Sequence, residues 1–162
     1  MSPETTAPRL RWVFLAYRLP REPSTPRITL WRKLRRLGVV QLGDSVVALP
    51  LDARTREQLE WVAEEVLEAG GEASLWLAEA ASAAGERGLT GRMTEAVAEE
   101  YRAVTAAAAN AFGESPGVHR RSLSRLRREL RRIRSRDHFP PPEAEQARRA
   151  VDALAQALEV RT

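Results

Sequence analysis

The sequence of 162 residues contains no cysteine, only two histidines and a single lysine, Lys33. The absence of cysteine excludes disulfides, zinc–thiolate sites and thiol redox chemistry. No apolar run approaches the roughly 20 residues that a membrane-spanning helix needs. Residues 1–9 lack the basic and apolar segments of a signal peptide. These absences predict a cytoplasmic protein, built as one domain or as a small domain with a helical extension.

The sequence also has little that resembles a catalytic site. The two histidines, His119 and His138, lie nineteen residues apart and have no third metal-ligating side chain in a matching pattern. No serine has a plausible His/Asp partner set, and no glycine-rich phosphate loop is present. We therefore expect no catalytic residue, no metal and no cofactor. The protein is expected to act by binding and not as an enzyme.

Charge is distributed unevenly along the chain, although the net charge is only +4. Residues 1–50 contain nine basic and three acidic side chains, a net charge of +6. Residues 51–112 contain five basic and twelve acidic side chains, a net charge of −7. Residues 113–162 contain twelve basic and seven acidic side chains, a net charge of +5. Two basic segments flanking an acidic one indicate either an anionic partner or a chain whose ends dock on its own centre.

Apolar periodicity and turn residues predict a compact α+β domain over residues 10–80. Its elements are a strand at Leu10–Tyr17, a helix from Ser24 or Thr25 to Leu37, strands at Val39–Leu42 and Ser45–Leu49 joined at Gly43-Asp44, a helix from Asp52 or Thr55 to Gly70, and a strand at Ala73–Ala78. This order predicts a ferredoxin-like βαββαβ fold, with four antiparallel strands covered on one face by two helices. Trp31, Trp61 and Trp76 lie in apolar stripes or strands and are expected in the core.

The remainder is predicted to be a linker at residues 81–91 and a three-helix extension at residues 92–160. The linker is rich in alanine, serine and glycine. Each helix has one apolar stripe, and the stripes begin at Met93, Leu123 and Ala147. Such helices are expected to pack with each other or against the sheet domain.

The most basic segment lies between His119 and Arg136, where Glu129 is the one acidic residue. We assign nucleic-acid binding to the arginines that surround its apolar stripe, Arg120, Arg121, Arg125, Arg127, Arg128, Arg131 and Arg132. Guanidinium groups spaced along a helix suit successive phosphates, and counterion release makes such binding salt-dependent. The structural alternative is a solvated helix face that docks on the acidic helix at residues 57–68.

A second basic patch surrounds the first predicted helix. Arg32, Lys33 and Arg36 lie on its outer side and are assigned to nucleic-acid backbone contact. Arg18, Arg21 and Arg27 are expected to converge on the start of this helix and to bind an oxyanion, because a helix N-terminus offers free N–H groups and a favourable dipole. The alternative is ordinary surface charge.

Residues 12–50 carry a pattern more specific than their periodicity. Its elements are an apolar strand, Leu19-Pro20, Arg27, Trp31-Arg32, Leu34, Leu37-Gly38 and a strand pair ending at Leu49-Pro50. With Gly70-Gly71-Glu72-Ala73 and the tail from Leu126 to Phe139, this pattern resembles the N-terminal domain of the chromate-resistance protein ChrB. The likeness extends over most of the chain.

The resemblance implies a transcriptional regulator or accessory protein of chromate resistance that binds DNA as a homodimer and responds to chromate. Longer members of the family have a second domain, which this chain is expected to lack. The alternative is therefore a protein–protein interaction module that works with a separate partner. The fold more distantly resembles the C-terminal domain of PaaX-type repressors and the small CRISPR-associated endoribonuclease. That nuclease has a metal-binding aspartate at the end of its first strand, where this chain has Tyr17-Arg18, so metal-dependent cleavage is not expected.

Overall fold

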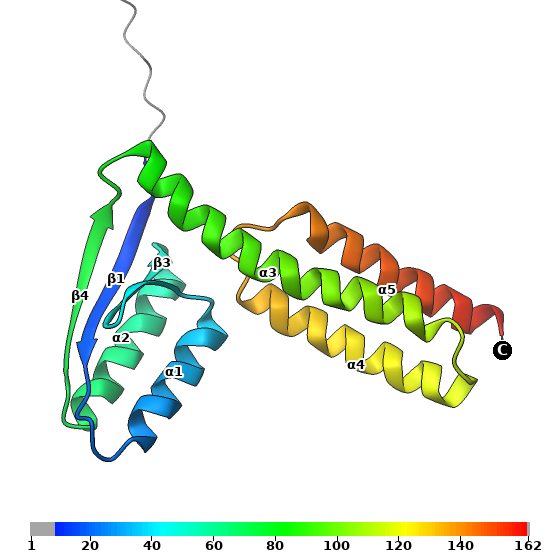
Figure 1. Cartoon of the computed structure of the whole chain (residues 1–162), viewed down its shortest axis with the longest axis horizontal. Coiled ribbons are helices and arrows are strands. Elements are labelled where there is room, and N and C mark those ends of the chain that lie inside the picture. Colours follow the sequence, from blue (N-terminus) through cyan, green and yellow to red (C-terminus); the bar gives the residue numbers. More distant parts are fainter. Residues whose placement is uncertain (1–8, 162) are drawn as a thin grey trace, which may run out of the picture. The chain divides into compact units, whose positions relative to one another are not determined.

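The computed structural model describes residues 9–161, and the chain divides into two compact units between Thr90 and Gly91 (Figure 1). The elements are β1 (Arg11–Arg18), α1 (Thr25–Leu37), β2 (Val40–Gly43), β3 (Val46–Pro50), α2 (Ala53–Glu68), β4 (Glu72–Glu79), α3 (Ala83–Ala111), α4 (Pro116–Ser135) and α5 (Pro142–Val160). The predicted α+β class is confirmed, with a four-stranded antiparallel sheet and five helices.

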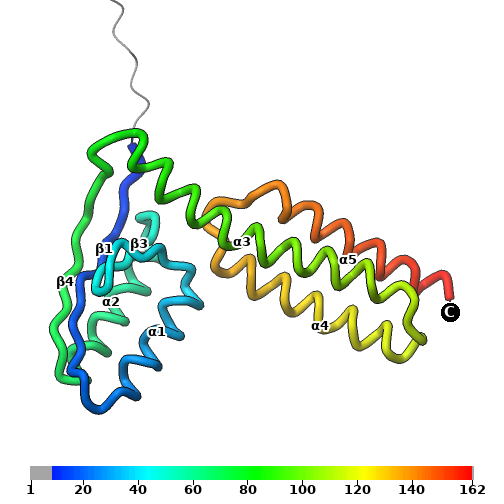
Figure 2. Tube along the Cα trace, in the orientation of Figure 1, coloured from blue at the N-terminus to red at the C-terminus, as the bar shows by residue number. Residues whose placement is uncertain are grey.

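The sheet of the first unit has the strand order β2-β3-β1-β4, and all three pairings are antiparallel. Helices α1 and α2 lie on the same side of the sheet (Figures 1 and 2). Side chains alternate along a strand, so Val13 and Leu15 of β1 face these helices, where they pack with Leu34, Leu59 and Val66. This cluster is the apolar core of the unit.

α1 begins and ends at the predicted residues, and α2 begins at the predicted cap Asp52 but ends at Glu68, two residues before the predicted Gly70. The two helices are capped differently. Pro26 lies in the first turn of α1, and Gly38 ends the helix with a left-handed φ of 76°, a conformation that glycine adopts without strain. The Ser24 side chain makes no capping hydrogen bond. At α2, Asp52 Oδ1 accepts a hydrogen bond from the Thr55 backbone N–H at 2.7 Å, and Thr55 Oγ1 accepts one from the Asp52 N–H at 2.9 Å. This reciprocal pair is a capping box.

The β2–β3 hairpin turns one residue later than the sequence predicted. The turn residues are Asp44 and Ser45, whereas Gly43 still belongs to β2. The pairing register shifts between Gln41 and Gly43, which marks an extra residue on β2. The prediction placed the turn at Gly43-Asp44 from residue type alone, and the extra residue on β2 moves it to Asp44-Ser45.

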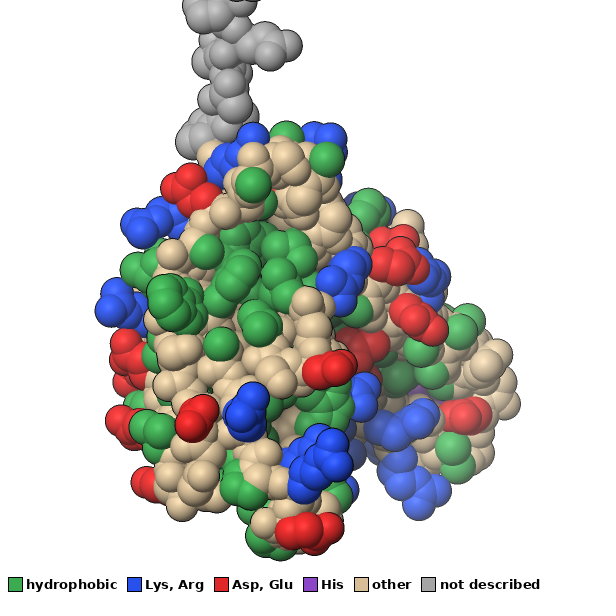
Figure 3. All heavy atoms as spheres, turned by 60° about the vertical axis from the view of Figure 1, so that its left-hand side comes forward, with side chains coloured by type: hydrophobic (Ala, Val, Ile, Leu, Met, Phe, Trp, Pro, Cys, Tyr) green, Lys and Arg blue, Asp and Glu red, His purple; other side chains and the backbone are tan. Residues whose placement is uncertain are grey.

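All three tryptophans that were expected in the core are exposed. The exposed fractions are 38% for Trp31, 62% for Trp61 and 62% for Trp76. Trp76 lies next to Leu75, which packs on the helix side of the sheet, so the pleat directs the indole to the opposite face. Apolar side chains gather on the face of the first unit that Figure 3 shows. The prediction was wrong because it used the apolar character of the three residues alone. Whether each side chain points toward the core depends on which side of its helix or strand it lies.

Most of the predicted linker at residues 81–91 is helical in the structure. Residues 83–91 form the first turns of α3, although they include Gly85, Gly88 and Gly91. The Ser82 hydroxyl accepts a hydrogen bond from the Gly85 N–H at 3.0 Å, and Glu86 lies in the first turn. These contacts satisfy and stabilise a helix start, and neighbouring alanines offset part of the cost of glycine.

The second unit is formed by α3 from Gly91 onward and by α4 and α5, which pack with each other. α3, α4 and α5 run side by side (Figure 2). Their buried side chains form one core, in which Tyr101, Leu130 and Leu154 represent the three helices. The apolar stripe of α4 is therefore occupied within this unit. Within residues 9–161, no helix combines the length and the apolar character needed to cross a membrane.

Candidate functional site

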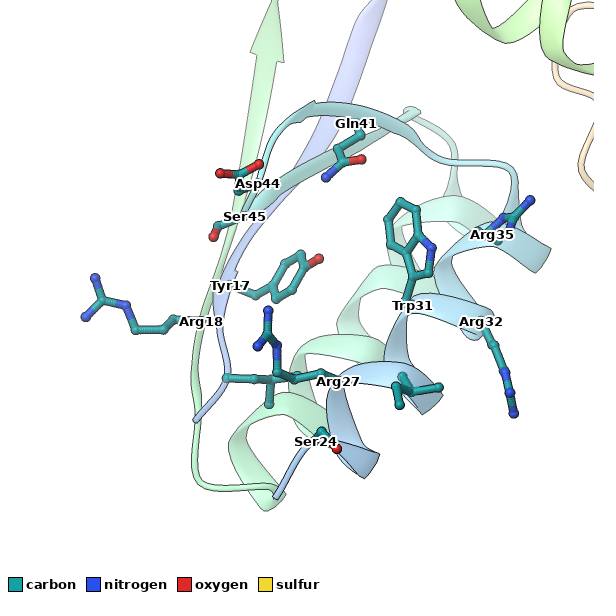
Figure 4. Close-up of a pocket in the computed structure, with 12 residues that line it drawn as sticks. Tyr17, Arg18, Ser24, Arg27, Trp31, Arg32, Arg35, Gln41, Asp44 and Ser45 are labelled. Atoms are coloured by element: carbon teal, nitrogen blue, oxygen red, sulfur yellow. The ribbon is translucent and has the colours of Figure 1, made fainter. Parts of the chain in front are cut away.

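A pocket of about 560 Å³ opens beside α1 in the first unit. It is lined by β1 and the loop after it, by α1 and by the β2–β3 hairpin, and Figure 4 shows its side chains. The lining residues include four arginines, Arg18, Arg27, Arg32 and Arg35, and one acidic residue, Asp44. This excess of positive charge makes the pocket a candidate anion site.

The lining side chains differ in direction. Figure 4 shows Tyr17, Trp31 and Gln41 pointing toward one another, with the Arg27 guanidinium beside the Tyr17 ring. Arg18 and Arg32 line the pocket but point away from its centre (Figure 4). Because neighbours on a strand face opposite sides of a sheet, Tyr17 is on the helix side and Arg18 is not.

Of the three arginines predicted to converge on an anion, the structure brings Arg27 to the centre and Arg18 to the rim. Arg21 is not among the lining residues. Tyr17, Trp31 and Gln41 were absent from the predicted site. The three residues are far apart in the chain and meet only because the β2–β3 hairpin lies beside β1 and α1.

The electrostatics favour a protonated Tyr17 hydroxyl next to a positive charge. Burial raises the pKa of Tyr17 above its usual value, and the charge of Arg27 opposes part of this shift. Tyr17 therefore remains a hydrogen-bond donor at neutral pH. Among residues 9–161, no carboxylate forms an ion pair with Arg27. Its positive charge remains available to an anionic ligand.

The outer basic patch of α1 is less uniform than the sequence indicated. Lys33 forms an ion pair with Glu65 of α2, so its charge joins the two helices of the first unit. Arg36 is exposed, and its Nε donates a hydrogen bond to the Arg32 carbonyl at 3.4 Å. Arg32 and Arg36 remain as surface cations, whereas Lys33 has a structural partner.

Helix α4 presents its arginines in two rows. One row contains Arg121, Arg125, Arg128 and Arg132, and the other contains Arg120, Arg127, Arg131 and Arg134. Residues three and four apart lie on the same side of a helix, and all eight side chains are exposed. A surface hollow of about 530 Å³ lies along the first row, between Val118 and Arg128.

Most of these arginines have no counter-charge within the chain. Arg132 lies 3.4 Å from Glu129, and Arg136, at the end of the helix, binds Glu100 of α3 at 2.6 Å. For the other seven arginines of α4, the ion pairs of the described residues include none. The residues assigned to nucleic-acid binding on α4 are therefore all exposed, in two rows on the part of the helix surface that faces away from the apolar stripe. The alternative docking of this face on residues 57–68 stays a prediction.

Neither histidine forms part of a metal-binding cluster. His119 is fully buried, and its Nε2 lies 2.9 Å from the Leu154 carbonyl oxygen of α5. This contact fits Nε2–H as the donor. Within residues 9–161, no group of three or more His, Asp or Glu side chains is arranged to hold a metal ion.

Near the end of α4, a buried tyrosine is held by a carboxylate. The Tyr101 hydroxyl donates a hydrogen bond to Asp137 Oδ2 at 2.8 Å. Burial, and next the hydrogen bond to Asp137, raise the pKa of Tyr101 well above its usual value. This pair joins α3 to the segment after α4 and has a structural role.

Comparison with known proteins gives one result. The model of the family described as "Protein ChrB, N-terminal" matches residues 27–114, which is 88 of the 162 residues. No curated protein and no solved structure matches the chain. The match begins at Arg27, in the first turn of α1, and contains both strands of the hairpin, α2, β4 and α3. The chain belongs to the family of the ChrB N-terminal domain.

Proposed function

We propose that this protein is a regulatory or accessory protein of chromate resistance that binds DNA through the arginine rows of α4. The observation that carries the proposal is the exposure of seven α4 arginines without an ion pair among residues 9–161. Because the apolar stripe of α4 is already buried against α3 and α5, its basic face remains available to a partner. Family membership supports the link to chromate resistance.

The contacts are proposed to be mainly to phosphates. The exposed face of α4 offers arginines and Ser124, with no asparagine or glutamine on the helix. Such a face lacks most of the side chains that read base edges, whereas guanidinium groups pair well with phosphate oxygens. From Arg121 to Arg132 the first row extends over about 16 Å of helix. This length is sufficient to contact several phosphates.

The remaining parts of the proposal concern the scaffold. The order of elements and the placement of α1 and α2 on one side of the sheet support a ferredoxin-like domain. We place the protein in the cytoplasm, as a homodimer and without enzymatic activity. The end of β1 carries Tyr17-Arg18 instead of an acidic metal ligand, which supports a binding role over metal-dependent cleavage.

The test is binding of the protein to double-stranded DNA from its own upstream region, across a salt series, by fluorescence anisotropy. The variant R127A/R128A/R131A/R132A removes two arginines from each row, and alanine preserves the helix. If all four side chains contact phosphates, the log–log salt slope shrinks by about 3.6, since each phosphate contributes about 0.9. The loss of affinity is expected to be similar on unrelated DNA of the same length.

The matched control is R54A/R56A/R87A/R92A, which lowers the net charge equally at exposed sites outside α4. The control is expected to retain most of the salt slope. A quadruple α4 variant that melts at a lower temperature but binds DNA like the wild type would show that the arginines have a structural role, and the proposal would be abandoned.

A second candidate function is oxyanion binding at the pocket beside α1. It is favoured by Arg27, which has no ion pair in the described chain, and by the protonated Tyr17 hydroxyl next to it. Chromate is the oxyanion that family membership suggests.

A further inference from the structure

The pocket beside α1 is much larger than a single oxyanion requires. Its volume of about 560 Å³ falls in the range of about 300–1,000 Å³ that is typical of pockets for small organic molecules. An oxyanion of five atoms placed at Arg27 would leave most of this space empty. The rest of the lining therefore contains information about the ligand.

The lining next to Arg27 is aromatic and polar, since Trp31 follows Arg27 by one turn of α1. The Trp31 indole is 38% exposed although it lies on a helix that buries its neighbour Leu30, and Figure 4 shows it facing the interior of the pocket. Exposed aromatic rings in concave sites stack on flat ligands, and base–aromatic stacking is tolerant of base identity. Gln41 extends toward the same region from β2 (Figure 4), and its amide carries both donors and an acceptor.

The anionic end of the ligand is defined by a different set of groups. The Tyr17 hydroxyl has no hydrogen-bond partner within residues 9–161, and the Arg27 guanidinium lies beside the Tyr17 ring. Ser24 adds a hydroxyl that is not used as a helix cap. A hydroxyl donor and a guanidinium together suit a phosphate group, because charge-assisted hydrogen bonds are stronger than neutral ones.

We infer that this pocket binds a flat heteroaromatic ring that carries a phosphate, with the size of a nucleoside monophosphate. The ring stacks on Trp31 and its edge meets the Gln41 amide, while the phosphate binds Arg27 and Tyr17. The ligand is either a free mononucleotide or the terminal nucleotide of a single strand. The inference shares Arg27 with the second candidate function, but it depends on Trp31, which an inorganic oxyanion does not need.

The test is isothermal titration of the full chain with adenosine and guanosine 5′-monophosphates, each nucleoside, inorganic phosphate, chromate and a 5′-phosphorylated single-stranded trinucleotide. The monophosphates are expected to bind, and nucleoside or phosphate alone to bind at least roughly tenfold more weakly, because each supplies only half of the contacts. Chromate binding without monophosphate binding would overturn the inference and leave the oxyanion function intact.

Two variants separate the two ends of the site. Trp31→Ala is expected to weaken monophosphate binding by roughly five- to hundredfold, the range that loss of base stacking produces, while Trp31→Phe restores most of it. Arg27→Gln is expected to weaken the monophosphate and inorganic phosphate by the same factor. The controls are Trp61→Ala, an exposed tryptophan on α2, and Arg21→Gln, which removes the same charge outside the pocket.

Titration with the 5′-phosphorylated trinucleotide shows whether the pocket binds a free nucleotide or the end of a strand. Equal affinity for the mononucleotide and the trinucleotide indicates a free nucleotide, and much tighter binding of the trinucleotide indicates a strand end. No detectable monophosphate or trinucleotide binding at millimolar concentration would overturn the inference. So would a folded Trp31→Ala variant, checked by circular dichroism, that binds like the wild type.

Discussion

Arg27 lies in a concave pocket beside Tyr17 and Trp31, whereas the arginines of α4 stand in rows on the outside of a helix. Both regions contain guanidinium groups without an ion pair in the described chain. In the pocket, one charge is combined with aromatic and hydroxyl groups, so shape and chemistry restrict the ligand. On α4, many charges repeat along a line, which matches a repeating polyanion. The same residue type therefore predicts different ligands when its neighbours and the curvature of the surface differ.

The largest expected effect is that each of two variants loses affinity for one ligand and keeps its affinity for the other. The α4 variant R127A/R128A/R131A/R132A should lose about a hundredfold or more in DNA affinity at moderate salt, while its affinity for a nucleoside monophosphate stays unchanged. Arg27→Gln should weaken binding of the nucleoside monophosphate and leave the DNA affinity unchanged. Anisotropy with duplex DNA and calorimetry with the monophosphate measure both ligands on both variants. If Arg27→Gln weakens DNA binding as much as the α4 variant does, Arg27 and the α4 arginines do not have separate ligands.

A smaller effect should distinguish the tyrosines of the two regions. Tyr101 donates a hydrogen bond to Asp137, whereas the Tyr17 hydroxyl has no partner within residues 9–161. Tyr101→Phe should therefore lower the free energy of unfolding by about 1–2 kcal/mol, and Tyr17→Phe should change it little. Urea denaturation measures both.

The pH dependence of Tyr101 has a definite sign. Because its pKa is raised in the folded state, its contribution is fully present below the unfolded pKa of about 10 and is lost as the pH rises above that value. Tyr101→Phe should reduce this alkaline loss of stability. A Tyr101→Phe variant as stable as the wild type at all pH values would show that the bond to Asp137 contributes nothing.

The smallest effect compares the starts of α2 and α4. Asp52 forms a capping box with Thr55, whereas the Ser115 side chain makes no capping hydrogen bond. Asp52→Ala should lower the free energy of unfolding by about 1 kcal/mol, and Ser115→Ala should leave it nearly unchanged.

The Asp52 cap should also depend on pH. The backbone hydrogen bond from Thr55 lowers the pKa of Asp52, so the stability that this cap contributes is present above the unfolded pKa and is lost as the pH falls through the folded pKa. Asp52→Asn should keep the cap and lose the acid dependence. Thermal melts at neutral and acid pH test all three variants, and equal losses for Asp52→Ala and Ser115→Ala would contradict the prediction.

The elements of the fold were predictable because their signals are local. Gly38 and Gly70 end helices through a left-handed backbone conformation, with φ of 76° and 83°, and the apolar stripes of α4 and α5 report which side is buried. The start of α3 was missed because its glycines look like a linker. The Ser82 cap is local and is visible in the sequence, whereas the hydrogen bond that Glu86 accepts from the Leu10 N–H depends on the folded chain. Gly71 shows the same limit: an added Cβ would lie 2.2 Å from the Arg18 carbonyl oxygen, a closeness that no sequence pattern displays.

The candidate sites differ in the same way. The arginine rows of α4 follow from helical periodicity, so they were predictable from the sequence. The pocket was predictable only in part, through Arg27. Tyr17 and Gln41 join it because β3 pairs with β1 and brings the β2–β3 hairpin to the end of β1. Trp31 joins it because its helix buries Leu30 and Leu34 instead. The pairing of distant strands positions Tyr17 and Gln41, and the orientation of α1 about its own axis exposes Trp31. Residue types alone reveal neither the pairing nor the orientation.

The arginine rows also have an energetic consequence for the helix that carries them. Arg121 and Arg125, Arg127 and Arg131, and Arg128 and Arg132 are like-charged neighbours four residues apart. Each such pair opposes helix formation by about 0.2–0.5 kcal/mol, so the bundle folds against its own electrostatic repulsion. Mobile ions screen that repulsion, and a bound polyanion removes it while binding only the folded form. The helical unit should therefore become more stable as salt is added, and most stable when its basic face is occupied.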